Sequence, residues 1–177
     1  GIIDGFRGCV DWGDYDNDGD LDIILGGQWI KAQIYRNDGN NIFTKIATDL
    51  PILAYSSVSW CDYDNDGDLD FIIAGYNGTT NASDTRLYQN KGNNIFTEVN
   101  NVILDVNTCS VAWGDYDNDG DMDLIISGST YSLGNDTSTP KTKIYRNDAP
   151  NTNSSPSIPS GIESKVIHNS VELKWNP

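Results

Sequence analysis

The sequence predicts an all-β fold made of three four-stranded units of the propeller-blade type, each with an acidic loop between its first two strands. The first observation is a nine-residue phrase, D-Y-D-N-D-G-D-x-D, which occurs at 14–22, 62–70 and 115–123. The second is the period, because these copies start 48 and then 53 residues apart. Repeats of roughly 40–50 residues that contain four short strands are typical of propeller blades.

The first two strands of each unit are expected to flank the acidic loop. Val and Trp stand two residues apart just before it, in VDW, VSW and VAW at 10–12, 58–60 and 111–113, so both side chains lie on one face of a strand. After each loop comes a short β-branched run that a glycine ends: LDIILGG, LDFIIAG or MDLIISG. Such runs predict buried strands.

The third and fourth strands are expected to form a β-hairpin. The segments at 34–46 and 87–99 are near-copies, IYRNDGNNIFTKI and LYQNKGNNIFTEV, in which apolar runs flank an N-D-G-N or N-K-G-N turn. A third copy begins at 144–148 and has no counterpart of NNIFTKI. Insertions rich in Asn, Thr and Ser, at 76–85 and 129–141, separate the second and third strands of the last two units.

The acidic loops have the chemistry of calcium sites. Each has aspartate at positions 1, 3, 5, 7 and 9 and glycine at position 6. Calcium takes about six to eight oxygen ligands in a flexible cage, which carboxylates at alternate positions of a tight loop can supply. We expect side-chain ligands from positions 1, 3, 5 and 9, a backbone carbonyl from position 7, and about one Ca²⁺ per loop. The candidate metal ligands are Asp14, Asp16, Asp18, Asp20, Asp22, Asp62, Asp64, Asp66, Asp68, Asp70, Asp115, Asp117, Asp119, Asp121 and Asp123.

The remaining loop positions fit the same interpretation. Glycine is needed at position 6, where the chain turns sharply through a backbone angle that is costly for residues with a Cβ. Asn17 and its counterparts at position 4 suit the turn, because Asn tolerates left-handed conformations. Five carboxylates in one loop repel each other, so the loop should loosen without its ion. Calcium is therefore expected to be structural.

Other ions and other loop families fit less well. Magnesium prefers strict octahedral geometry and keeps several waters. Zinc and copper need soft ligands, whereas the chain has one His and three scattered Cys. An EF-hand loop ends in a bidentate Glu at position 12, where this chain has Leu25, Ile73 and Ile126. EF-hands and dockerin modules also need helices beside their loops. An acidic turn without a metal is the plain alternative, which three identically spaced copies disfavour.

These residues resemble the FG-GAP/VCBS repeat of integrin-α-like calcium-binding β-propellers. The wording W-G-D-Y-D-N-D-G-D-L-D is most similar to that of secreted bacterial proteins. The resemblance implies a propeller part at 1–148, with blades at about 8–48, 56–100 and 108–148. Such propellers usually close with about seven blades, so we expect this chain to be a segment of a larger β-propeller. An open or oligomeric arrangement of the blades is the alternative.

A second module is expected after residue 148. Residues 149–157 are polar and proline-rich and predict a linker. Val171, Leu173 and Trp175 then alternate with charged residues, as in a half-buried strand. The wording of 158–177 resembles the first two strands of a fibronectin type III domain, and His168 would lie in the turn between them.

Charge and cysteine content argue against several classes of protein. The formal net charge of −15 disfavours nucleic-acid binding, which needs a basic face. No apolar stretch approaches transmembrane length, so membrane insertion is not expected. Cys9, Cys61 and Cys109 do not occupy equivalent repeat positions and are expected to be free, mostly buried thiols. A Cys9–Cys109 bridge would need close approach of two non-adjacent blades.

The leading functional hypothesis is an extracellular, calcium-stabilised propeller module of a secreted or cell-surface protein, which the resemblance assigns to a Gram-negative bacterium. Its implied role is adhesion or binding of an extracellular protein or glycan, beside further blades or domains of the same protein. Trp29, Tyr76 and Tyr131 could stack on a sugar, or they could cap neighbouring blades. The alternatives are a structural spacer of a surface fibre or layer and a non-catalytic accessory domain of a secreted enzyme. No nucleophile–base pair, P-loop or zinc motif supports an enzyme.

Overall fold

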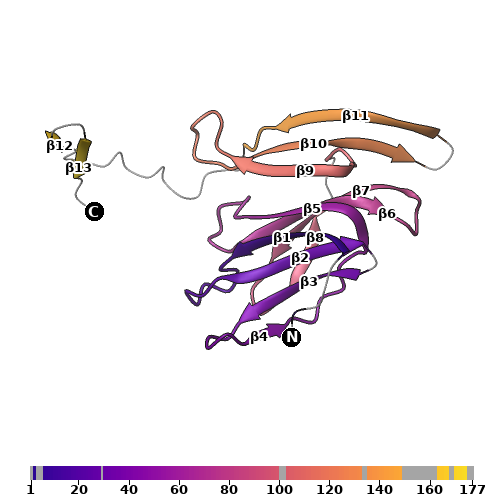
Figure 1. The fold of residues 1–177 in the computed structure, drawn as a ribbon, viewed down its shortest axis with the longest axis horizontal. Coiled ribbons are helices and arrows are strands. Elements are labelled where there is room, and N and C mark those ends of the chain that lie inside the picture. The colour runs from indigo at the N-terminus through magenta and orange to yellow at the C-terminus, as the bar shows by residue number, and fades with distance from the viewer. Residues whose placement is uncertain are drawn as a thin grey trace.

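The fold consists entirely of β-strands in the part of the chain that the structure describes. This computed structural model describes residues 2, 6–28, 30–99, 103–132, 135–148, 163–167 and 170–174. These residues form three blade-like sheets and one separate two-stranded hairpin, in which all neighbouring strands are antiparallel. The all-β class and the blade-like units predicted from the sequence are therefore confirmed, and the three sheets do not close into a ring (Figure 1).

The first two sheets each contain four strands that pair in chain order. The first sheet consists of β1 (Phe6–Gly13), β2 (Asp22–Gln28), β3 (Ile30–Asn37) and β4 (Phe43–Lys45). The second consists of β5 (Leu53–Cys61), β6 (Asp70–Asn77), β7 (Ala82–Asn90) and β8 (Phe96–Val99). The acidic loop joins the first two strands of each sheet, as the sequence predicts. We call these sheets blade 1 and blade 2.

Blade 3 has three strands in the described residues. They are β9 (Asn107–Gly114), β10 (Asp123–Ser132) and β11 (Asn135–Tyr145), with β10 in the centre. The prediction of four strands in every unit is therefore wrong for the described part of this one, because the chain before residue 149 has no counterpart of NNIFTKI to form the fourth strand. Most of the polar insertion at 129–141 belongs to strands rather than to a loop, because Thr130 and Thr139 pair across β10 and β11. The insertion at 76–85 likewise lengthens β6 and β7.

The hairpin turns follow the expected chemistry. Gly39 and Gly92 have φ of +75° and +71°, and the two asparagines after each glycine also have positive φ. Glycine and asparagine tolerate this left-handed region best, so the N-D-G-N and N-K-G-N segments can turn the chain from the third strand into the fourth. This confirms the predicted hairpins of blades 1 and 2.

The core lies between the blades rather than within one sheet. Ile24 and Ile34 of blade 1 pack in one cluster with Trp60 and Phe71 of blade 2. The Trp60 ring stacks on Tyr15, with ring centroids 5.9 Å apart and planes at 7°. Each blade thus buries its apolar surface against the next one, as repeat proteins do.

The second inter-blade core repeats this arrangement. Ile72 and Leu87 of blade 2 join Val111, Leu124 and Ile126 of blade 3 in one cluster. Contacts of β5 with both β1 and β9 place the first strands of the three blades next to one another. Blade 2 therefore lies between blades 1 and 3 (Figure 1).

Each first strand contains a bulge with a left-handed residue. Arg7, Tyr55 and Thr108 occupy equivalent positions and have φ of +50°, +53° and +47°. The pairing register shifts beside each of them. A positive φ is unusual for residues with large or β-branched side chains. The strain therefore recurs at one end of the blades, away from the acidic loops.

The three cysteines are free thiols, as expected. Cys61 is buried, whereas Cys9 and Cys109 are half-buried. The Cys109 Sγ lies 3.4 Å from the carbonyl oxygen of Ala74 in blade 2. Burial raises the pKa of Cys109 to about 11.

The predicted second module is described only in part. Strands β12 (Glu163–Ile167) and β13 (Ser170–Lys174) pair antiparallel, with Val166 opposite Val171. The predicted strand around Val171 and Leu173 is therefore present. The linker at 149–157, His168 and Trp175 lie outside the described residues, as does Trp29.

Candidate metal centres

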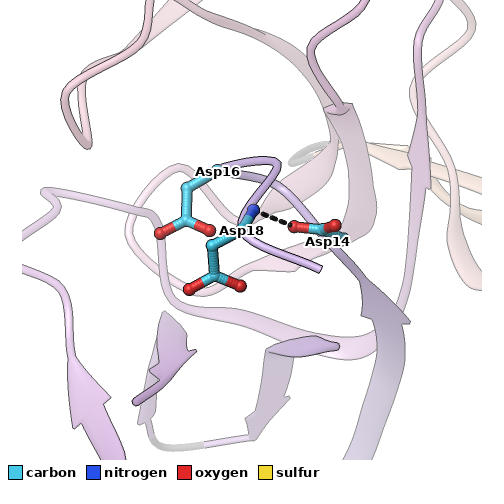
Figure 2. A group of neighbouring side chains, drawn as sticks. All are labelled: Asp14, Asp16 and Asp18. Carbon is cyan, nitrogen blue, oxygen red and sulfur yellow. Dashed lines mark hydrogen bonds between the residues drawn. The ribbon is translucent and has the colours of Figure 1, made fainter. Parts of the chain in front are cut away.

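The first acidic loop gathers three carboxylates. One oxygen each of Asp14, Asp16 and Asp18 lies within 4.8 Å of the other two. Figure 2 shows the Asp16 and Asp18 carboxylates next to each other, while Asp14 accepts a hydrogen bond from the Asp18 backbone N–H. The sequence therefore brings positions 1, 3 and 5 together, as a cation site requires.

The other loops form matching clusters. In blade 2 the same three positions meet, in Asp62, Asp64 and Asp66. In blade 3 the group consists of positions 1, 3 and 9, in Asp115, Asp117 and Asp123. Each cluster contains carboxylate oxygens only, a donor set that suits a hard cation.

Position 1 fixes the shape of each loop. Asp14 accepts the backbone N–H groups of Asp18 and Gly19, both at 3.0 Å. Asp62 and Asp115 accept the equivalent N–H groups at 3.0 to 3.1 Å. The same loop geometry thus occurs three times.

The turn residues have the predicted left-handed backbone. At position 6, φ is +93°, +95° and +94° in Gly19, Gly67 and Gly120. At position 4, φ is +60°, +56° and +61° in Asn17, Asn65 and Asn118. Both sequence-based assignments are confirmed, since these conformations favour glycine and are tolerated by asparagine.

Position 9 ties each loop to the third strand of its own blade. The buried Asp22 accepts the backbone N–H of Tyr15 at 3.1 Å and that of Asn37 at 2.7 Å. Asp70 and Asp123 make the equivalent pairs of bonds. Burial raises the pKa of Asp22 to about 6 and that of Asp70 to about 7. A carboxylate has about four lone-pair sites, so each retains capacity for a metal ion.

Position 3 has the clearest features of a metal ligand. Asp64 Oδ1 and Asp117 Oδ1 are buried and have no hydrogen-bond donor. Desolvation raises the pKa of Asp64, and the neighbouring carboxylates of Asp66 and Asp62 raise it further. Buried polar atoms are normally satisfied. A bound cation would satisfy these oxygens and offset the repulsion in the cluster.

The loop of blade 3 has a basic neighbour. Arg146 Nε lies 3.2 Å from Asp117 Oδ2, and its Nη2 lies 3.5 Å from Asp119 Oδ2. The equivalent residue beside the loop of blade 2 is the neutral Gln89, which donates to Asp64. The contact with Arg146 is consistent with the absence of Asp119 from the third cluster. Sequence analysis did not assign a role to Arg146.

Position 7 links one loop to the next through its side chain. The Asn17 amide of loop 1 donates to Asp68 Oδ1 of loop 2 at 2.8 Å. Asn65 of loop 2 donates in the same way to Asp121 Oδ1 of loop 3 at 2.7 Å. The sequence predicted only a carbonyl ligand at position 7, and these inter-loop bonds were missed. Their signal was the presence of both Asn and Asp in every copy.

The asparagine that ends each third strand also joins two blades. Asn90 Nδ2 of blade 2 donates to the Tyr15 carbonyl of blade 1 at 2.9 Å. Asn147 Nδ2 of blade 3 donates to the Tyr63 carbonyl of blade 2 at 2.6 Å. These contacts hold the acidic loop of one blade against the hairpin of the next.

The candidate ligand-binding aromatic residues meet at the other end of blades 2 and 3. Tyr76 and Tyr131 are in edge-to-face contact, with ring centroids 5.8 Å apart. They pack across the two blades and also line a pocket of about 280 Å³. Both of the uses considered from the sequence are compatible with this position.

The fold and the three carboxylate clusters define a class of protein: a β-repeat protein with blade-like sheets and a potential cation loop in each. A family model described as FG-GAP-like repeat matches residues 14–73 and 62–126, which together span more than half of the chain. The chain belongs to the FG-GAP-like repeat family. Such repeats are non-catalytic, often bind calcium and are typical of extracellular or cell-surface proteins.

Two further results are negative. Comparison with curated protein sequences finds no match for this chain. In the described part of the chain, no helix is long and apolar enough to span a membrane.

Proposed function

We propose that this chain is a calcium-stabilised repeat module of a secreted or cell-surface protein, with one Ca²⁺ in each acidic loop. The observation that supports this most strongly is the pair of buried, donor-free oxygens at position 3, Asp64 Oδ1 and Asp117 Oδ1. Each lies in a cluster with two further carboxylates. An anionic oxygen that is withdrawn from water needs a counter-charge. Arg146 supplies part of this charge to Asp117 through its other oxygen, and a hard divalent cation would supply the rest.

The proposed ligands are the side chains at positions 1, 3, 5 and 9 and the carbonyl at position 7. In loop 2 these belong to Asp62, Asp64, Asp66, Asp70 and Asp68. Calcium tolerates this number of ligands in an irregular cage better than magnesium does. Extracellular calcium is near millimolar, so sites of modest affinity would be filled there.

Calorimetric titration of the chelator-stripped chain, with circular dichroism alongside, tests this proposal. We expect about three Ca²⁺ to bind with a gain of β-sheet signal, because the ions remove the repulsion within each loop. An Asp18→Ala variant should bind one ion fewer. Magnesium serves as the control ion and should bind more weakly. Absence of calcium binding would contradict the proposal.

A second proposed function is ligand binding, with a glycan as the candidate ligand. The pocket of about 280 Å³ is lined by Tyr55, Tyr76, Asn107, Thr108, Tyr131 and Ser138. Tyrosine faces can stack on sugar rings while hydroxyl and amide groups form hydrogen bonds. Two of its residues, Tyr55 and Thr108, have positive φ. Backbone strain of this kind is often found at functional sites.

A glycan array with matched variants tests this second function. Tyr55→Ala and Tyr131→Ala should each abolish the array signal and leave calcium binding unchanged. Tyr116→Ala removes an exposed tyrosine at the acidic-loop end and should leave the signal intact. Absence of glycan binding by the unmodified chain would favour packing between blades as the role of these tyrosines, and with it the structural-spacer alternative.

The wider setting belongs to the same proposal. We propose the division into blades at 1–148, a linker at 149–157 and the start of a fibronectin type III-like domain at 158–177. The paired β12 and β13 support a β-rich second module. A modular adhesion protein of a Gram-negative bacterium would combine these parts, and an accessory domain of a secreted enzyme is the alternative.

A further inference from the structure

The blades pack through the same two faces each time. We call the face with the second- and third-strand side chains Ile24 and Ile34 the trailing face. We call the face with the first-strand Val and Trp, here Val58 and Trp60, the leading face. The trailing face of blade 1 packs on the leading face of blade 2 in one hydrophobic cluster. The trailing face of blade 2 packs on blade 3 in the same manner.

In the described part of the chain, no blade packs on the trailing face of blade 3. Ile125 and Ile144 are 43% and 56% exposed, whereas Ile24 and Ile34 at the equivalent positions of blade 1 are 0% exposed. Tyr116 of the third loop is likewise exposed, while its counterpart Tyr15 is buried. These side chains line a pocket of about 240 Å³ together with Trp113 and Leu124. A contiguous apolar face of this kind indicates an interaction site.

Among the described residues, no blade packs on the leading face of blade 1 either. Val10 and Trp12 are 60% and 54% exposed, whereas Val58 and Trp60 of blade 2 are each 7% exposed. The two uncovered faces are therefore the two halves of an interface that the chain already forms twice.

The polar contacts of that interface are also available at both ends. Within the chain, the Asn at loop position 4 donates to the Asp at position 7 of the next loop, as in the bond from Asn17 to Asp68. Asn118 of blade 3 and Asp20 of blade 1 occupy the same two positions, and both are exposed. Asn37 on blade 1 is equivalent to Asn90, which donates to the Tyr15 carbonyl of the preceding blade. The Tyr116 carbonyl of blade 3 is the matching acceptor.

The shape of the interface repeats as well. A Cβ added at Gly13 of blade 1 would lie 2.7 Å from Leu69 and 2.8 Å from Trp60 of blade 2, so blade 2 packs closely on this glycine. The equivalent Gly114 of blade 3 has open space around it. Leu21, the counterpart of Leu69, is exposed on blade 1.

We propose that two copies of this chain join head to tail, with the trailing face of blade 3 in one copy against the leading face of blade 1 in the other. At this interface, blade 1 of the second copy supplies the exposed Val and Trp, the hydrogen-bond partners and the close contact on the glycine. Blades 2 and 3 supply the same features within the chain. Head-to-tail contacts form rings when the rotation closes. The described parts of two copies contain six blades, which is within the range of roughly four to eight in closed β-propellers, so a dimer closed through both interfaces is consistent with this range.

Light scattering coupled to size-exclusion chromatography, over a wide concentration range in calcium, tests this proposal on the full chain. We expect twice the mass of a single chain. Ile125→Asp disables the trailing face and Trp12→Asp the leading face, so each variant alone should be monomeric. An equimolar mixture should recover a two-chain species, because one variant retains each face. That species should be weaker than the unmodified dimer, since it has one interface instead of two.

Ile42→Asp is the matched control. Ile42 is exposed in the hairpin turn of blade 1, and its counterpart Ile95 is exposed even though blade 2 has neighbours on both faces. This variant should remain dimeric. Circular dichroism checks that all variants are folded, which their exposed positions favour. A monomeric unmodified chain overturns the proposal and favours a further blade of a longer polypeptide as the occupant. A Trp12→Asp variant that still dimerises also overturns it, since that result indicates a symmetric contact between two blade 3 faces.

Discussion

The side-chain amide of Asn17 in the first acidic loop donates a hydrogen bond to the carboxylate of Asp68 in the second, at 2.8 Å. Asn65 and Asp121 repeat this bond between the second and third loops. The left-handed backbone at position 4 thus allows a turn and also presents the side chain to the next blade. The loops form a connected row, so the structure of each one contributes to the packing of its neighbour.

Replacing Asn65 separates these two roles. Asn65→Ala loses the amide and places an alanine at a φ of +56°, a conformation that asparagine tolerates better than alanine does. We therefore expect a loss of about 2–3 kcal/mol in the free energy of unfolding. Asn65→Gly loses only the amide and should cost about 1 kcal/mol. Urea denaturation in the presence of calcium measures both. Equal losses in the two variants would contradict a contribution from the backbone conformation.

Asp64→Asn should lower the stability of the chain in calcium but not in excess chelator. With the ion bound, the variant loses an anionic ligand and should be less stable by about 1–2 kcal/mol at millimolar calcium. In excess chelator it should be as stable as the unmodified chain or more so, because one of the mutually repelling carboxylates is removed.

Thermal unfolding with and without chelator checks this prediction. Asp49→Asn is the control, because Asp49 pairs with Lys31 outside the loops. Its effect should be the same in both conditions. A loss of stability for Asp64→Asn that is equally large in chelator would show that Asp64 acts without a metal.

Arg146 should weaken calcium binding at the third loop. Its guanidinium lies 3.2 Å from Asp117 and repels an incoming cation, although its exposure to solvent screens the effect. Arg146→Gln introduces the residue type found at the equivalent position beside loop 2, and we expect about three- to tenfold tighter binding at loop 3. NMR titration followed at the Gly120 amide measures that site. Arg86→Gln, at a position that pairs with Asp84 and Glu98, should leave the affinity unchanged.

The half-buried thiol of Cys109 should make stability fall at high pH. Burial raises its pKa from 9.0 to about 11 in the folded chain. Its contribution is thus fully present below pH 9, and it is lost as the pH rises through 11. The loss amounts to about 3 kcal/mol at most. Urea denaturation between pH 8 and 11 should show a shallower decline for Cys109→Ala than for the unmodified chain. Parallel declines would contradict the raised pKa.

The elements of the fold could be predicted because their signals are local. Alternation in VSW, the apolar run after each loop and the glycines at position 6 each specify a conformation within a few residues. The candidate clusters could be predicted from spacing, since one tight loop brings positions 1, 3 and 5 together in blades 1 and 2 and positions 1, 3 and 9 in blade 3. Because the motif occurs three times, the same assignment applies to three loops.

The contacts between blades could not be predicted in the same way. Asn17 and Asp68 are 51 residues apart, and no local pattern indicates which side chains of two loops will meet. The proximity of Arg146 to Asp117 likewise depends on where the third strand ends relative to the loop. The polar insertions were misleading because Thr and Ser, which are common in loops, can continue a hairpin once the preceding strands are paired.

The two equivalent glycines, Gly13 and Gly114, should respond differently to one added methyl group. In Gly13→Ala the Cβ would approach Leu69 and Trp60 to within 2.7–2.8 Å, so blade 2 must shift, and we expect a loss of about 1–3 kcal/mol. In Gly114→Ala nothing lies within 4 Å of the new Cβ, so the free energy of unfolding of the single chain should remain nearly unchanged. Urea denaturation at low protein concentration measures both. Because the proposed dimer places Leu21 and Trp12 of a second copy against Gly114, the same alanine should weaken dimerisation in light scattering. If Gly114→Ala alters neither stability nor association, the close approach seen at Gly13 is not repeated between copies.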